Sequence, residues 1–317
     1  MRTQFLVIAV ASAVFAGCAA EPEPPAPEPE ASTPTPDVLP ATIVAERGGF
    51  VPEGVEYDAA NGRILTGSLV EGSVLQIHSD GRVTTVVTDP ELVSSVGIEA
   101  DEPGNRLLVV NSDRSVFGGE TAGQAKLGVY NLATGARLAM VDLAAADVGA
   151  SSDAAYFAND VAVGEDGTAY VTDTRMGMIY QVEANYEASV LHRFDDFSPN
   201  GIVHHSSGYL LTGGGAALWK VPLDDPAGAT PVTLPEEVPG QDGMVWTVEG
   251  HLAIVSNSGN RVVALASEDN WATAHVVGVA TYETPASTAA VVGDDIYVIH
   301  PHFADEDPPS VERVVFQ

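Results

Sequence analysis

The sequence is poor in cysteine and in basic residues. Cys18 is the single cysteine, so neither an intramolecular disulfide nor a zinc site built from cysteines can form. Only 13 Lys and Arg residues stand against 44 Asp and Glu, which gives a formal net charge of −31 at pH 7. Because this charge repels phosphate backbones and anionic lipid surfaces, we expect no nucleic-acid partner and no adsorption to a membrane.

Long apolar runs are also missing, except for a short one near the N-terminus. Residues 5–16 follow a single base, Arg2, and are too few to span a bilayer as a helix. Residues 15–18 read FAGC, and the segment resembles a bacterial lipoprotein signal. We therefore expect residues 1–17 to be removed and Cys18 to carry the lipid that anchors an exported protein to the bacterial cell envelope, in the periplasm or on the outer surface. Phe15 replaces the usual leucine, so a cleaved signal without lipidation is the alternative.

The chain beyond the signal divides into a spacer and one domain. Residues 18–40 alternate Pro and Glu with hardly any apolar residue, which predicts an extended, semi-rigid spacer. Over the whole chain, 45% hydrophobic residues are enough for a packed core, and 31 Gly with 21 Pro indicate many turns. The domain is expected over residues 41–317.

This domain contains a repeated unit, in which an apolar residue is followed by a Gly or Asp turn and an alternating strand. Six copies can be aligned on their turn residues, with separations of 42, 63, 41, 42 and 44: Gly62, Gly104, Gly167, Gly208, Gly250 and Asp294. A period of roughly 40–45 residues with about four short strands is typical of propeller blades. We predict an all-β fold, a six-bladed β-propeller; a solenoid of the same repeats is the alternative.

Two further features concern how the predicted propeller closes and where its long loops lie. Residues 41–46 (ATIVAE) precede the first copy, and we expect this N-terminal strand to complete the last blade beside residues 311–316 (VERVVF). Such closure leaves no sheet edge exposed. The long interval contains two insertions, residues 112–124 and 144–156, which are predicted as loops on one face.

Oxygen-bearing side chains begin four of the copies in one register: Glu53, Asn159, Asn200 and Asp242. Inner strands of a propeller run along its axis, so these residues can converge on a central pocket. Two carboxylates and two amides suit a hard divalent cation, with Ca²⁺ expected and Mg²⁺, Mn²⁺ or Zn²⁺ as alternatives. The competing interpretation is that Asn-Asp, Asn-Gly and Asp-Gly are only turn residues.

These four positions, with the segments SPNG from Ser198 and QDGM from Gln241, resemble the metal ligands of the regucalcin/gluconolactonase family, which includes luciferin-regenerating-enzyme-like proteins. The resemblance covers residues 41–317. It implies a six-bladed propeller that hydrolyses lactones with one bound divalent metal, and it implies that Asp242 is both a ligand and the catalytic base.

One departure from that family concerns the substrate. Its sugar-acid lactonases have an Arg shortly before the third-blade Asn, whereas this chain has residues 156–158, YFA. A cationic sugar-acid pocket is therefore not supported, and Phe157 indicates a less polar substrate. His204 and His300 are further pocket candidates and potential general bases, although a histidine on a strand is more often structural.

Other polar residues have weaker interpretations. Glu99, Asp160 and Asp173 are candidates for outer-shell partners of the metal ligands or for solvated strand ends. The serines lack the context of a nucleophile elbow, so a Ser-His-Asp hydrolase is not supported. The sequence thus favours a metal-dependent hydrolase of a small lactone or ester, and the alternative is a propeller that binds a ligand or protein without catalysis. A quinone-dependent dehydrogenase is disfavoured because the pocket residues lack clustered Lys and Arg.

Overall fold

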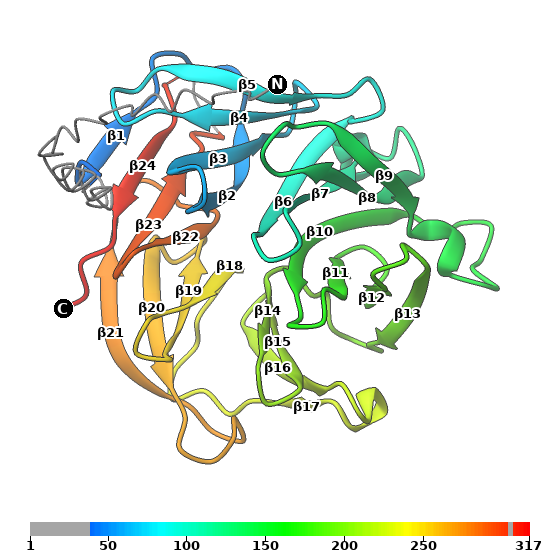
Figure 1. Ribbon diagram of the computed structural model, residues 1–317. Coiled ribbons are helices and arrows are strands. Elements are labelled where there is room, and N and C mark those ends of the chain that lie inside the picture. The colour runs from blue at the N-terminus through cyan, green and yellow to red at the C-terminus, as the bar shows by residue number, and fades with distance from the viewer. Residues whose placement is uncertain (1–38, 304–306) are drawn as a thin grey trace, which may run out of the picture. The chain divides into compact units, whose positions relative to one another are not determined.

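A computed structural model describes residues 39–303 and 307–317 (Figure 1). The predicted signal peptide, Cys18 and almost all of the spacer lie outside the described residues. The described chain is built from β-strands, as the repeats predict, and it also contains short 3-10 helices. None of its helices has the length and apolar character that crossing a membrane requires.

Four of the sheets have four strands each. In chain order they contain β2 (Pro52–Asp58), β3 (Arg63–Ser68), β4 (Ser73–Ile77) and β5 (Val83–Thr88); β14 (Ile202–His205), β15 (Tyr209–Gly214), β16 (Ala217–Pro222) and β17 (Thr230–Pro231); β18 (Gln241–Trp246), β19 (Leu252–Ser256), β20 (Arg261–Ala266) and β21 (His275–Thr281); and β22 (Ala289–Val292), β23 (Asp295–His300), β24 (Ser310–Arg313) and β1 (Thr42–Val44). Each of these sheets is a propeller-like blade.

The remaining strands form one eight-stranded sheet: β6 (Ser94–Asp101), β7 (Arg106–Ser112), β8 (Gly123–Asn131), β9 (Arg137–Asp142), β10 (Tyr156–Val163), β11 (Ala169–Asp173), β12 (Met178–Val182) and β13 (Ala188–Arg193). A parallel pairing of residues 123–124 with 156–157 joins its two halves. Residues 123–124 end the first predicted insertion and residue 156 ends the second, and the insertions also contain the 3-10 helices η1 (Arg114–Gly118) and η2 (Ala144–Ala146). A third, η3 (Pro226–Gly228), precedes β17. The insertions therefore do more than form loops.

The N-terminal strand completes the last sheet. Strand β1 pairs antiparallel with β24, with Ile43 opposite Val311. Ile43 and Val311 are both buried, so the pairing also seals one end of the core. The expected closure by the N-terminal strand is confirmed.

The sheets follow one another around a common centre, and the first strand of each four-strand run lies innermost (Figure 1). These inner strands are β2, β6, β10, β14, β18 and β22, and all six contribute residues to one central cavity. Their side chains thus reach the axis from every side, as the alignment of the repeats predicts.

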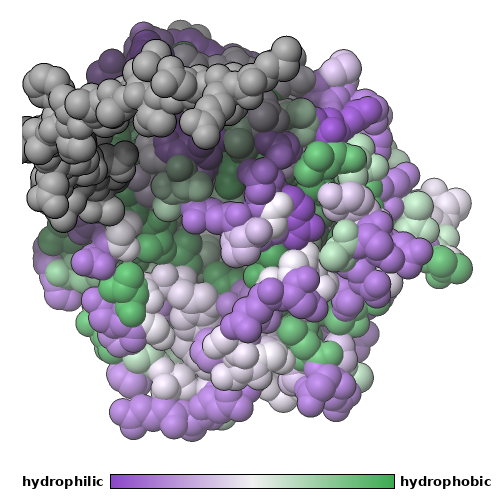
Figure 2. Space-filling model, in the orientation of Figure 1, coloured by the Kyte–Doolittle hydropathy of each residue, from purple (hydrophilic) through white to green (hydrophobic). Residues whose placement is uncertain are grey.

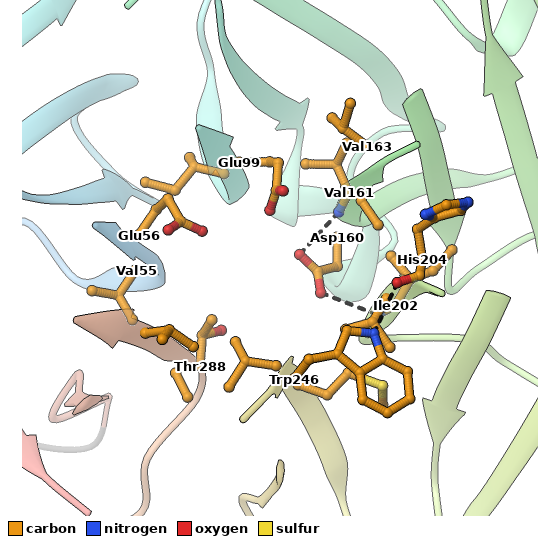
Figure 3. Close-up of a pocket in the computed structure, with 17 residues that line it drawn as sticks. Val55, Glu56, Glu99, Asp160, Val161, Val163, Ile202, His204, Trp246 and Thr288 are labelled. Carbon is orange, nitrogen blue, oxygen red and sulfur yellow. Dashed lines mark hydrogen bonds between the residues drawn. The ribbon is translucent and has the colours of Figure 1, made fainter. Parts of the chain in front are cut away.

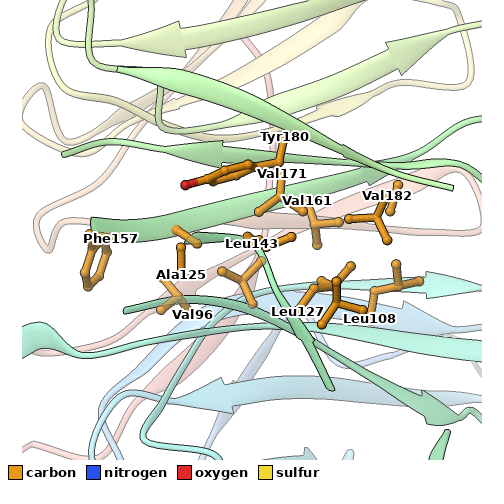
Figure 4. Packing of buried hydrophobic residues seen from close by; sticks show 14 of the residues in the cluster. Val96, Leu108, Ala125, Leu127, Leu143, Phe157, Val161, Val171, Tyr180 and Val182 are labelled. Carbon is orange, nitrogen blue, oxygen red and sulfur yellow. The ribbon is translucent and has the colours of Figure 1, made fainter. Parts of the chain in front are cut away.

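Apolar side chains pack between neighbouring sheets. The cluster in Figure 4 joins the two halves of the eight-stranded sheet and includes Leu127, Val161 and Tyr180, each at most 2% exposed. Large exposed hydrophobic residues are separated from one another in the sequence, and hydrophilic residues cover much of the face seen in Figure 2. The core therefore consists of layers between sheets.

A buried ion pair recurs at the turn of the first two repeats. Asp58 accepts from Arg63 Nε at 2.7 Å, and Asp101 accepts from Arg106 Nε at 2.7 Å. The Arg106 guanidinium also donates to the carbonyl of Gly167, at 2.8 Å, in the other half of the same sheet. Arg63 likewise donates to the Leu132 carbonyl, so each arginine connects its own turn to the following strand run.

We expect Arg106→Met to lower the free energy of unfolding by about 3–5 kcal/mol, because Asp101 would remain buried without its partner. The exposed pair of Arg47 and Glu71 provides the control. Arg47→Met should cost less than about 1 kcal/mol. Urea unfolding of both variants measures the difference, and equal losses would contradict a structural role for the buried pair.

Candidate functional site

Four inner strands have the same irregularity near the axis. The register shifts between Ala158 and Val161 in β10, and it shifts at the corresponding places in β2, β6 and β18. A β-bulge of this kind redirects side chains and is common beside active sites. Three of the four predicted ligands, Glu53, Asn159 and Asp242, lie in these bulges.

Immediately after the predicted ligands, the inner strands approach one another so closely that most positions are glycine. A Cβ atom on Gly54 would lie 2.5 Å from the carbonyl oxygen of Val96, and one on Gly97 would lie 2.5 Å from Asp160 Oδ1. We call the six residues at this level the axial ring: Gly54, Gly97, Asp160, Gly201, Gly243 and Thr288.

Contacts between neighbouring strands continue around the whole axis. The Ile202 amide donates to Asp160 Oδ2 at 3.2 Å, and a Cβ atom on Gly243 would lie 2.6 Å from Thr288 Oγ1. The hydroxyl of Ser287 donates to the Glu53 carbonyl at 2.7 Å and joins the last sheet to the first. The axial ring is thus a continuous contact between all inner strands.

Asn159 presents an oxygen that lacks a partner. Its side chain is 7% exposed, and Nδ2 donates to Thr174 Oγ1 at 2.9 Å. Its Oδ1 atom is buried and has no hydrogen-bond partner. Because an unsatisfied buried oxygen costs free energy, this atom requires a donor or a cation.

Glu53 and Asp242 are half-buried residues whose carboxyl groups respond to nearby charge. Burial first, and then the charges of Asp242 and Asp160, raise the pKa of Glu53 well above its usual value. Burial and the charge of Asp160 raise the pKa of Asp242 to about 8, although a hydrogen bond from the Asn200 side chain opposes the rise. Like charges held in one place need protons or a cation to balance them.

The four predicted ligands therefore fit a hard cation in their chemistry. They bring two carboxyl groups, one amide oxygen without a partner, and a second amide in contact with one of the acids. In residues 39–303 and 307–317 there is no group of three or more His, Cys, Asp or Glu side chains that could hold a metal ion. The predicted set has a different composition, because two of its four members are amides.

On the other side of the axial ring, the inner strands enclose a cavity of about 210 Å³ (Figure 3). Glu56, Glu99 and Asp160 project into it, and its lining contains no Lys or Arg. Burial raises the pKa of Asp160 to about 7 and that of Glu56 to about 8. Burial, followed by the charges of Glu56 and Asp160, raises the pKa of Glu99 well above its usual value. The cavity is thus acidic, and no Lys or Arg in its lining compensates the carboxyl groups.

The three pocket candidates lie in different surroundings. His204 lines the central cavity, beside Trp246, whose Nε1 donates to the His204 carbonyl at 2.8 Å. Phe157 instead lies in the hydrophobic core, where its ring packs against Phe117 with 4.7 Å between centroids. Apolar packing accounts for this position, so Phe157 cannot report on substrate polarity. His300 is 3% exposed and lines a separate cleft.

Sequence reasoning missed Glu56 and Trp246, and it treated Glu99 and Asp160 only as outer-shell candidates. A signal was present, because Glu56 and Glu99 occupy the same position in the repeats that begin VEYD and IEAD. Asp173 is a turn residue, since its Oδ1 accepts from the backbone amides of Phe157, Arg175 and Met176.

Neither a protein-family model nor a curated protein sequence matches the chain, whereas many solved structures do. The Malassezia sympodialis allergen Mala s 1 is 17% identical, with a TM-score of 0.71 over 87% of this chain and 96% of that one. Luciferin-regenerating enzyme is 14% identical, with a TM-score of 0.62 over 86% and 94%. A putative gluconolactonase is 16% identical, with a TM-score of 0.62 over 88% and 96%.

The chain shares its fold with these proteins. The family resemblance seen in the sequence is matched, because luciferin-regenerating enzyme and a gluconolactonase-like protein are among the structural neighbours. Identities this low establish the fold alone.

The axial ring generates a prediction about packing. Gly54→Ala should destabilise the protein by about 1–3 kcal/mol, because its Cβ meets backbone atoms of β6 that cannot move aside. Gly118 in η1 is the control, since a Cβ there would meet only ordinary contacts at 3.6 Å or more. Thermal unfolding should show little change for Gly118→Ala, and equal stability of the two variants would contradict the ring.

The acidic cavity generates a prediction about pH. Carboxyl groups in the unfolded chain titrate near about 4, so raised values in the folded state make stability fall as pH rises from about 4 to about 8. Glu99→Gln removes one of these charges and should reduce the fall in Tm for metal-free protein. Replacing the exposed Glu120 by Gln should leave the dependence of Tm on pH unchanged. A wild-type Tm that does not vary with pH would contradict a cluster of carboxyl groups with raised pKa values.

Proposed function

We propose that the protein is a divalent-metal-dependent hydrolase of a lactone or a related ester. The observation that carries this proposal is the unpartnered, buried Oδ1 atom of Asn159 in register with Glu53 and Asp242. A fold shared with luciferin-regenerating enzyme and a putative gluconolactonase supports it. The proposed ligands are Glu53, Asn159, Asn200 and Asp242, and Ca²⁺ is the expected ion.

A bound divalent cation would polarise the substrate carbonyl and orient the attacking water. The residues of the chain supply the remaining functions. Asp242 is the proposed general base, because a cation beside its carboxyl group would favour the ionised form that accepts a proton. The Asn200 amide lowers the pKa of Asp242, which favours the ionised form of that carboxyl group.

The residues before Asn159 provide no cation for a sugar-acid carboxylate. Tyr156 places its hydroxyl 3.3 Å from Asp147 Oδ2, and Phe157 is a core residue. We therefore propose a substrate without a carboxylate, a neutral lactone or ester.

We also propose how many blades the protein has and where it is located. The two halves of the eight-stranded sheet, β6–β9 and β10–β13, each contain four strands, and we count them as two blades of a six-bladed propeller. Export and a lipid anchor at Cys18, which would hold the domain at the cell envelope, are proposed from the sequence of the first 18 residues.

A second function is a binding propeller without catalysis. The acidic cavity favours it, because hydrolysis at the predicted ligands gives no role to Glu56 or Glu99. Elemental analysis of the purified protein, followed by a panel of lactones and aryl esters with and without chelator, separates the two functions. Bound metal with chelator-sensitive turnover supports the hydrolase, and absence of turnover on the panel supports binding alone.

We expect Asp242→Asn to abolish turnover and to weaken Ca²⁺ binding by more than the roughly 10–100-fold that loss of an outer-shell partner costs. Calorimetric titration with Ca²⁺ and rates on the active substrate measure both effects. Asp294→Asn, in an exposed turn, removes the same charge away from the site and should change neither. Unchanged Ca²⁺ affinity in Asp242→Asn would refute the ligand assignment.

A further inference from the structure

A second cleft, of about 330 Å³, lies beside the end of β23 and shares no lining residue with the central cavity. Residues from the loop after β21 form one wall, and β23 and β24 form the other. This volume is within the range of small-molecule sites and far exceeds the roughly 30 Å³ that one water occupies in the liquid.

His300 lines this cleft and has an unpartnered ring nitrogen near Glu312, another lining residue. Nδ1 lies 3.0 Å from the Thr284 carbonyl and 3.3 Å from the Pro285 carbonyl, and carbonyl oxygens only accept, so Nδ1 carries the proton. Burial lowers the pKa of His300 despite Glu312 and these carbonyls, so the neutral ring leaves a lone pair on Nε2. Nε2 is buried without a hydrogen-bond partner, although Glu312 Oε2 lies 3.5 Å away.

Tyr282 provides a second unpartnered group in the same cleft. Its hydroxyl is buried without a hydrogen-bond partner, and its ring packs edge-on against His300 with 5.0 Å between centroids. Burial and the charge of Glu312 keep the phenol protonated, since both raise its pKa. Two residues that line the cleft therefore hold one unsatisfied hydrogen-bond acceptor and one unsatisfied O–H donor.

The wall that carries these groups is held in place by hydrogen bonds. The Tyr282 amide donates to the Asn260 carbonyl at 2.8 Å, and Asn257 Nδ2 donates to the Ala286 carbonyl at 2.8 Å. The Ser287 amide donates to the Ile299 carbonyl at 3.1 Å. The backbone of this wall is thus fixed, whereas the two unpartnered atoms are themselves buried, so a ligand reaches them when a lining side chain moves aside.

We propose that this cleft binds a neutral polyhydroxy compound, such as a monosaccharide or cyclic polyol. One hydroxyl group of such a ligand can donate to His300 Nε2 and accept from Tyr282 at the same time, which satisfies both buried groups. The carboxylates of Glu283, which is exposed, and of Glu312, which is partly exposed, can accept further hydroxyls, and the lining contains no Lys or Arg to attract an anion.

An ammonium ligand suits the cleft less well. It can donate to His300 and Glu312, but it has no lone pair to accept from the Tyr282 hydroxyl. A sugar acid would place its carboxylate beside Glu283 and Glu312. The site does not depend on a bound metal, so it stands apart from the proposed hydrolase.

The test is a titration of the ¹⁵N-histidine-labelled protein with D-glucose, myo-inositol, trimethylammonium and sodium gluconate, monitored by the imidazole resonances. His300→Gln assigns the His300 signals. We expect a saturable shift of the His300 Nε2 signal with glucose or inositol, and Tyr282→Phe should weaken binding by roughly 2- to 10-fold.

Tyr297→Phe is the matched control for Tyr282→Phe. Tyr297 lies on β23, the strand of His300, but its hydroxyl donates to the Leu39 carbonyl and not to the cleft. It should bind like the wild type, and Asp242→Asn should bind equally, which separates this site from the metal site. A His300 shift with trimethylammonium or gluconate alone, equal affinity in Tyr282→Phe, or no saturable shift with glucose or inositol would overturn the proposal.

Discussion

The close approach of the inner strands at the axial ring is the constraint on which the rest of the structure depends. The strands meet there because Gly54, Gly97, Gly201 and Gly243 lack a Cβ atom. This approach, together with the repeated bulge, places the preceding side chains at one level around the axis. The ring therefore determines where the predicted ligands lie and separates them from the acidic cavity.

Charge is concentrated on both sides of this ring. Glu53 and Asp242 lie on one side and Glu56 and Glu99 on the other, and Asp160 influences the pKa of all four. No Lys or Arg lines the cavity that could neutralise them. The folded protein must therefore keep protons on these groups or acquire a cation, and the unpartnered oxygen of Asn159 favours a cation at the level of Glu53.

The strands and the closure by β1 could be predicted because the repeats and their turns are local signals. The joining of two strand runs through residues 123–124 and 156–157 could not, since a two-residue parallel contact depends on how the insertions fold. The four oxygen positions were predicted from register. The position of Phe157 in the core could not be predicted, because periodicity does not show which face of a bulged strand meets the core. The cleft at His300 could not be predicted either, because a loop from another repeat forms one of its walls.

The central claim is that Glu53, Asn159, Asn200 and Asp242 together hold a divalent cation. The most direct measurement is anomalous diffraction from crystals grown with Ca²⁺ or Mn²⁺. The account predicts one strong peak within bonding distance of oxygens from all four side chains. A peak only in the cavity between Glu56, Glu99 and Asp160, or no peak at the axis, would contradict it.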